Sequence, residues 1–183
     1  MEKMRRMKRQ KGFTLLETMI AMAVLSFGIL SLVAVFTQGL QTSSGNQIQF
    51  IAQAKAQEAM ETIFTARDTH ILSWAQINNT SKGGVFLDGP QPLLAAGPDG
   101  LVGTADDDAN NPNTIIVGPP GTDDIMTTSG DKTINLNPWM TRTIAFIPVT
   151  GTPNLNQVTV TVIYTFQGKQ SQFQLICYIS NYA

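Results

Sequence analysis

The sequence is poor in the residues that build disulfides and metal centres. It has one cysteine, Cys177, and one histidine, His70, among 183 residues. A single cysteine excludes an intramolecular disulfide. A lone histidine, without a second histidine or a cysteine at ligand spacing, predicts a surface or capping residue, not a zinc ligand. Cys177 lies in an alternating apolar pattern, which favours a buried, inert thiol over a reactive one.

The common signatures of catalysis are also missing. The chain contains no Gly-x-Ser-x-Gly nucleophile elbow, no P-loop, no His-Glu-x-x-His and no Gly-x-Gly-x-x-Gly. Clustered aspartates alone do not indicate acid–base chemistry. The sequence therefore predicts a protein that is not an enzyme and has no catalytic residues.

The first third of the chain lacks proline and, for a long stretch, charge. No proline precedes Pro90, so one helix over residues 13–66 is expected, about 80 Å long at 1.5 Å per residue. Residues 13–36 carry a single formal charge, Glu17. That run exceeds the roughly 20 apolar residues that cross a bilayer. We therefore expect a transmembrane half at 13–39.

Basic residues gather before this apolar run. They are Lys3, Arg5, Arg6, Lys8, Arg9 and Lys11, half of the twelve Lys and Arg in the chain. Such a flank predicts a cytoplasmic N-terminus, with residues after about 40 outside. Without residues 1–12, six Lys and Arg remain against twelve Asp and Glu, a net charge of −6. This acidity argues against nucleic-acid binding.

The junction between the basic leader and the apolar run has an unusual order. A secretory signal has a shorter apolar region and is cleaved after it, but here the glycine comes before it, in Gly12-Phe13-Thr14-Leu15-Leu16-Glu17. This pattern closely resembles the class III signal of type IV prepilins and type II secretion pseudopilins. The resemblance implies cleavage between Gly12 and Phe13 by a prepilin peptidase and N-methylation of Phe13. A plain signal anchor with a chance glycine is the alternative.

Glu17 has physical significance of its own. A carboxylate within a membrane helix is costly and usually marks function or a buried partner. The alternative is a carboxylate that just reaches the membrane interface, where the energetic cost is smaller. The pilin resemblance implies that Glu17 pairs with the N-terminal amine of a neighbouring subunit. That pairing would neutralise the charge in hydrocarbon, so Glu17 points to assembly.

The second half of the expected helix, residues 40–66, changes character. Apolar residues recur at three- and four-residue steps, which predicts one face packed on a core. They are Ile48, Ile51, Ala52, Ala56, Ala59, Met60 and Ile63. Lys55 and Glu58 lie one turn apart and are expected to pair on the exposed side.

Residues 67–183 are expected to form a globular head that contains an irregular acidic loop at 88–138. The loop holds seven of the nine prolines: Pro90, Pro92, Pro98, Pro112, Pro119, Pro120 and Pro138. A loop of this length is usually functional or partly disordered.

Four aspartates of this loop are candidate calcium ligands: Asp99, Asp106, Asp107 and Asp108. Carboxylates and carbonyls held by glycine turns suit calcium, although the alternating Asp positions and the closing Glu of an EF-hand are absent. An acidic, solvated turn fits the same residues. Asp123 and Asp124 form a second, smaller cluster.

The C-terminal segments 141–149, 157–166 and 172–179 alternate apolar and polar residues, with a glycine turn near Gly168. They predict three antiparallel strands packed on the amphipathic half of the helix. The expected fold is α+β and similar to that of type IV pilins.

The expected function is structural, as a minor type IV pilin that is assembled into or primes a filament. Residues 20–30 and 178–181 resemble minor pilins of the PilV type. Two alternatives are a type II secretion pseudopilin and a membrane-anchored binding module that uses the 88–138 loop. The implied partners are other pilin or pseudopilin subunits, the prepilin peptidase and the inner membrane, with later exposure in the periplasm or in a cell-surface filament.

Overall fold

The computed structural model describes residues 12–116, 133–137 and 139–181. The chain divides into two compact units, Met1–Ser44 and Gly45–Ala183, which we describe separately. The leader residues 1–11 and the candidates Asp123 and Asp124 lie outside the described residues.

The helix α1 runs over Leu15–Asp68, close to the predicted range of 13–66. Thr14 caps its start, since its Oγ1 and its carbonyl oxygen accept hydrogen bonds from the backbone N–H of Glu17 at 3.3 and 3.1 Å. Past the end of α1, His70 has a positive φ of 57° and donates its backbone N–H to the carbonyl of Arg67 at 3.0 Å. His70 is exposed, as predicted.

In the first unit, every described side chain from residue 12 to residue 44 is exposed. Several hydroxyls of this segment bond within the helix, as Ser26, Ser31 and Thr37 donate to carbonyls one turn earlier at 2.7, 2.8 and 2.9 Å. A hydroxyl satisfied in this way needs no water, so these polar residues suit an apolar surrounding.

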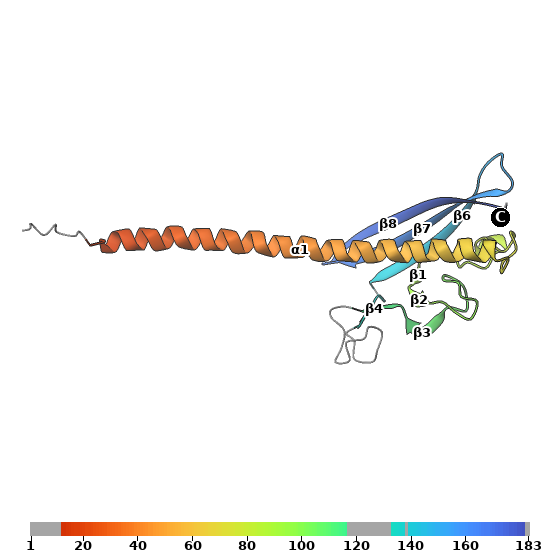
Figure 1. The fold of residues 1–183 in the computed structure, drawn as a ribbon, viewed down its shortest axis with the longest axis horizontal. Coiled ribbons are helices and arrows are strands. Elements are labelled where there is room, and N and C mark those ends of the chain that lie inside the picture. The colour runs from red at the N-terminus through yellow and green to blue at the C-terminus, as the bar shows by residue number, and fades with distance from the viewer. Residues whose placement is uncertain (1–11, 117–132, 138, 182–183) are drawn as a thin grey trace, which may run out of the picture. The chain divides into compact units, whose positions relative to one another are not determined.

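The second unit contains a four-stranded antiparallel sheet in the order β1-β6-β7-β8 (Figure 1). Its strands are β1 (Gln91–Pro92), β6 (Met140–Pro148), β7 (Leu155–Phe166) and β8 (Lys169–Ser180). The three long strands confirm the predicted antiparallel sheet, and the short β1 was not predicted. A two-residue turn joins β7 to β8, with positive φ at Gln167 and Gly168 (51° and 76°), as a type I′ hairpin requires.

The core of this unit lies between the sheet and the part of α1 that follows residue 45. The helix contributes Ala52, Ala56, Ala59, Met60 and Ile63, all buried as the apolar stripe predicted, and β7 contributes Val158, Val160 and Val162. Small alanines on the helix face allow close approach of the sheet. Cys177 packs against this core but is only partly buried, so the prediction of a buried thiol holds only in part.

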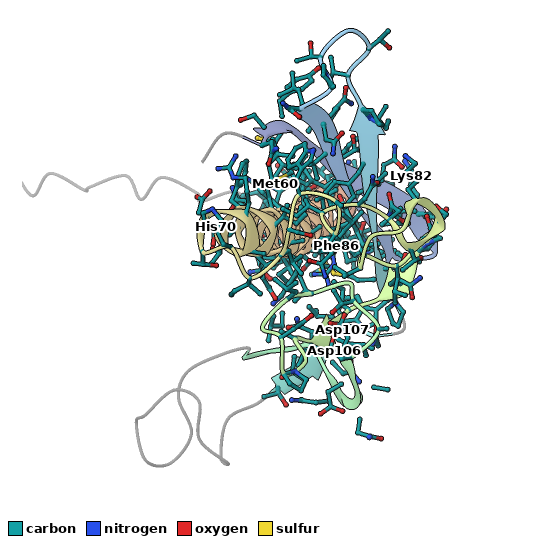
Figure 2. All side chains as sticks on the ribbon, turned by 90° about the vertical axis from the view of Figure 1, so that its right-hand side faces the viewer. Met60, His70, Lys82, Phe86, Asp106 and Asp107 are labelled. Atoms are coloured by element: carbon teal, nitrogen blue, oxygen red, sulfur yellow. The ribbon has the colours of Figure 1, made fainter. Side chains whose placement is uncertain are left out.

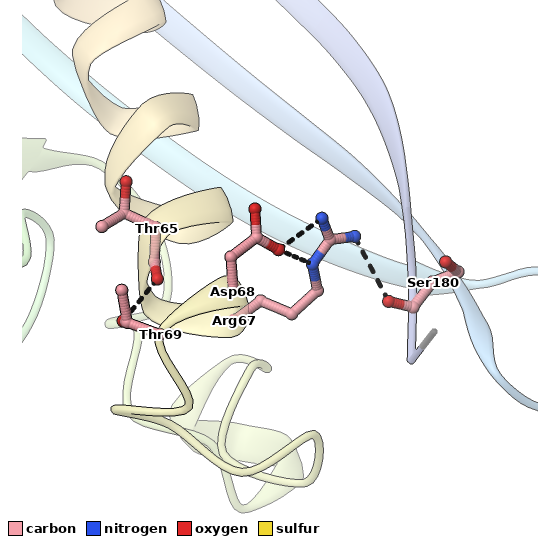
Figure 3. Close-up of polar contacts among 5 residues, drawn as sticks. All are labelled: Thr65, Arg67, Asp68, Thr69 and Ser180. Carbon is pink, nitrogen blue, oxygen red and sulfur yellow. Dashed lines mark hydrogen bonds and ion pairs between the residues drawn. The ribbon is translucent and has the colours of Figure 1, made fainter. Parts of the chain in front are cut away.

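Polar contacts join α1 to its own turns and to β8. Arg67 lies between Asp68, at 2.7 Å, and the carbonyl oxygen of Ser180, at 3.4 Å (Figure 3). Lys55 and Glu58 form the predicted ion pair at 2.6 Å. Both side chains are half-buried, whereas the sequence predicted that they would lie on the exposed side of the helix.

The described residues of the 88–138 region contain more regular structure than the sequence predicted. Its described residues form two small antiparallel ladders, β2 (Leu94–Ala95) with β3 (Asp108–Pro112) and β4 (Thr114–Ile116) with β5 (Thr133–Asn135). A 3₁₀ turn, η1 (Thr80–Lys82), precedes them. The buried side chains of Leu93, Leu101, Val102 and Leu136 join this region to the core.

Candidate functional site

The predicted cleavage site lies immediately before the first helix. Gly12 and Phe13 have no regular secondary structure, and α1 starts at Leu15. Phe13 is 81 % exposed, and no atom lies within 4 Å of a Cβ built on Gly12. A protease acts on extended, accessible backbone, so the geometry is compatible with cleavage between these two residues.

Glu17 lies in the first turn of α1, where a negative side chain is favoured by the helix dipole. Its side chain is exposed, and it forms no ion pair with the described residues. An exposed carboxylate at this position is accessible to neighbouring molecules.

Large apolar side chains surround Glu17 on the first half of α1. Leu15, Leu16, Met19 and Ile20 are 78, 67, 61 and 56 % exposed. In the described part of the chain, α1 is the one helix long and apolar enough to cross a membrane, with a mean hydropathy of 2.5 over its best window. An exposed apolar surface of this extent marks contact with lipid or with other proteins.

Each of the four candidate calcium ligands accepts a hydrogen bond from a neighbouring group of the loop. Asp99 accepts a hydrogen bond from the N–H of Leu101 at 2.8 Å, and Asp108 accepts one from the N–H of Asn110 at 2.9 Å. Both are local turns in which the carboxylate caps its own backbone. Within the described ranges, no three His, Cys, Asp or Glu side chains gather in a group that could hold a metal ion.

The other two aspartates are neighbours with different surroundings (Figure 2). Asp106 is exposed and accepts from the hydroxyl of Thr104 at 2.8 Å, which lowers the pKa of its carboxyl. Asp107 is half-buried and accepts from the N–H of Gly103 at 2.7 Å, and its burial raises its pKa. The calcium hypothesis stays untested, but the structure shows that the carboxylate oxygens of Asp106 and Asp107 accept hydrogen bonds from Thr104 and Gly103.

Sequence reasoning missed the buried polar residues of the described chain, which are Asn79, Thr104, Arg142 and Asn156. Asn79 is 5 % exposed and bonds to the backbone of β6, and Arg142 is 1 % exposed. A signal for Arg142 was present, because it falls on the same strand face as Ile144 and Phe146. No local pattern marks Asn79, because its partners lie 65 and 67 residues further along the chain.

Comparison with known proteins agrees with this geometry at the N-terminus. The family model for the prokaryotic N-terminal methylation motif matches residues 7–33, which include Gly12, Phe13 and Glu17. No curated protein and no solved structure matches the chain.

The match and the fold agree on one class of protein. The matched residues contain the predicted cleavage site and the apolar start of α1, and the second unit has the α+β architecture expected for a pilin head. Proteins with this motif are structural and not enzymatic, in line with the sequence prediction. The chain carries the class III N-terminal methylation signal typical of type IV pilins and pseudopilins, on a pilin-like α+β fold.

Proposed function

We propose that this chain is a minor type IV pilin, a structural subunit that is assembled into a filament or primes its growth. The observation that carries the proposal is the methylation motif at residues 7–33, which leads into a helix segment whose side chains are exposed from residue 12 to residue 44. Prepilin peptidase cleaves between Gly12 and Phe13, and the new amine of Phe13 is methylated.

The apolar segment has two successive environments in this proposal. Before assembly it anchors the subunit in the inner membrane, with the basic leader in the cytoplasm and the head outside. During assembly the same surface packs against other subunits. Glu17 pairs with the Phe13 amine of a neighbour, because an unpaired carboxylate in hydrocarbon costs about 3 kcal/mol.

Residues 20–30 and 178–181 favour a minor pilin of the PilV type, because these segments resemble that group. A pseudopilin of a type II secretion system is built from the same parts and is the second candidate. Deletion of the gene separates the two. Loss of surface pili supports the pilin, and loss of protein export with intact pili supports the pseudopilin.

Processing is tested by mass spectrometry of the N-terminus of protein purified from its host. We expect wild-type protein to begin at methylated Phe13, and the Gly12→Glu variant to retain the leader. Gly28→Ala is a matched glycine control, since no atom lies within 4 Å of a Cβ at that position, and it should be processed normally. An intact leader on wild-type protein would favour a membrane-anchored binding module instead.

A further inference from the structure

The strand β8 forms the open edge of the four-stranded sheet (Figure 1). The N–H of Asn181, just beyond β8, donates to the carbonyl of Asn154 at 2.9 Å, and the β7–β8 register continues from there without a break. In an antiparallel pair, residues that bond to the neighbouring strand alternate with residues whose N–H and C=O groups point away from it. The outward groups of β8 therefore belong to its even-numbered residues, Gln170, Gln172, Gln174, Ile176 and Tyr178. Within the described ranges, the backbone groups of these five residues have no hydrogen-bond partner on their outward side.

The strand β8 has few of the features that keep an edge strand from pairing with another chain. Such strands are usually very short, bulged, charged or interrupted by proline. In contrast, β8 has 12 residues and an unbroken register. It contains no proline, and its single charge, Lys169, lies at its first position. A strand of this kind is a template for the addition of another strand.

The opposite edge of the same sheet is closed. There β1 pairs with the first part of β6. Further along β6, the amide of Asn79 bonds to the N–H of Phe146 at 3.0 Å and to the carbonyl of Ile144 at 2.8 Å, and Lys82 Nζ donates to the carbonyl of Phe146. The sheet can therefore be extended beside β8 and not beside β6.

The inner face of β8 leaves apolar side chains partly uncovered. On β7, the side chains of Val158, Val160 and Val162 are fully buried. The residues opposite them on β8 pack against the core but are only partly buried; they are Cys177, Leu175 and Phe173. A further strand beside β8 would cover this apolar row with side chains of its own. Because residues 170–180 carry no charge, the segment that fits is uncharged, with apolar residues at every second position.

We propose that β8 is a docking edge, to which an extended segment of a different pilin subunit binds as a fifth strand. The backbone of that segment pairs with the outward N–H and C=O groups of β8, and its alternate apolar side chains cover the row of Phe173, Leu175 and Cys177. The choice of donor rests on the proposed function, because a minor subunit is surrounded by other pilins in the membrane and in the filament. Anchoring in one membrane raises the effective concentration of subunits, so a contact made of a few backbone hydrogen bonds is sufficient.

Photo-crosslinking of the full chain in its host tests whether another subunit lies beside this edge. The photoreactive residue p-benzoylphenylalanine replaces either Ile176 on β8 or Ile147 on β6, which are 49 and 52 % exposed and lie on the same outer face of the sheet. Position 176 should give an adduct with another pilin subunit, and mass spectrometry should place the joined residue in an uncharged segment. Position 147 is the control and should give little adduct, since it lies two strands away, about 10 Å. Equal yields at the two positions, no adduct at 176, or an adduct there with a second copy of β8 or with a protein that is not a pilin would overturn the proposal.

Backbone pairing is tested by Gln174→Pro, with Gln174→Ala as the matched control. The N–H of Gln174 points outward, so proline removes it without breaking the ladder to β7. We expect the adduct from position 176 to be about tenfold weaker in Gln174→Pro and unchanged in Gln174→Ala. Equal yields in the two variants would overturn the proposal.

A second variant and a processing check complete the test. Leu175→Lys keeps every backbone N–H and places a charge in the apolar row, so it should also remove the adduct even if Gln174→Pro does not fold. An unchanged adduct in Leu175→Lys would overturn the proposal. Methylated Phe13 in the same samples shows that the subunit is processed, so a missing adduct then counts against the docking edge and not against the proposed function.

Discussion

The side-chain amide of Asn79 makes the hydrogen bonds to the backbone of β6 at Ile144 and Phe146 that a neighbouring strand would otherwise make. Its Oδ1 accepts the backbone N–H of Phe146 at 3.0 Å, and its Nδ2 donates to the carbonyl of Ile144 at 2.8 Å. The strand β1 pairs with β6 only at Thr141 and Arg142, so the rest of this edge needs other partners. Where side chains already bond the N–H and C=O groups of an edge strand, those groups are not available for pairing with a strand of another chain.

Removal of the Asn79 amide should destabilise the head. Asn79→Ala leaves a buried N–H and a buried carbonyl of β6 without partners, which costs about 1–3 kcal/mol for each unsatisfied group. Urea unfolding of residues 45–183, the compact unit that contains the core, measures the loss. Asn110→Ala, at an exposed position, is the control and should change little. Equal midpoints for the two variants would show that the edge is satisfied by something else.

Replacement of Glu17 should affect assembly and leave folding intact. Glu17→Ala removes the proposed partner of a neighbour's amine, but makes the helix more apolar, so membrane insertion should persist or improve. The amount of the subunit in sheared filaments, relative to the amount in membranes, measures recruitment. Glu61→Ala is a control on the same helix, since Glu61 is exposed in the second unit. Wild-type incorporation of a cleaved, stable Glu17→Ala protein would disprove the mechanism.

The neighbours Asp106 and Asp107 should titrate in opposite directions from an ordinary aspartate. The hydroxyl of Thr104 lowers the pKa of Asp106, so the stability it contributes is present above the unfolded pKa and is lost as pH falls through the folded value. Burial raises the pKa of Asp107, so its contribution is present below the unfolded pKa and is lost as pH rises through the folded value.

Carboxyl carbon shifts followed by NMR against pH measure both residues in one sample. Thr104→Val should raise the pKa of Asp106 towards that of a free aspartate, about 3.9. A pKa of Asp106 that is the same in Thr104→Val and in wild type would rule out the hydroxyl as the cause.

Calcium should leave the melting temperature of the head unchanged. Each of the four candidate aspartates already accepts a hydrogen bond within the loop, and they do not form a cluster of three. Thermal melts of residues 45–183 in millimolar calcium and in chelator make the comparison. A rise of several degrees with calcium, abolished by Asp106→Ala combined with Asp107→Ala, would instead establish a calcium site, since a ligand at a hundredfold excess over its Kd stabilises by about 2.7 kcal/mol.

The sequence alone predicted the structural elements that follow a local residue pattern. The apolar run with its single Glu17, the three- and four-residue spacing of Ala52 to Ile63 and the alternation in β7 predicted the helix, its buried face and the long strands. Each of these elements spans many residues with one period, so its identity follows from near neighbours. The signal at Gly12 is equally local, and the family model finds it there.

Only the tertiary structure decided how the middle of the chain is held. The strands β2 and β4 have two and three residues, too few to show a period. The amide of Asn79 becomes an edge partner only because folding brings it to residues 65 and 67 positions away. The alternation of β6 places Arg142 on one face with Ile144 and Phe146, but a charged side chain is expected at the surface, and only the structure shows that it is 1 % exposed. Burial and pairing of such groups depend on contacts between distant parts of the chain, which no window of sequence contains.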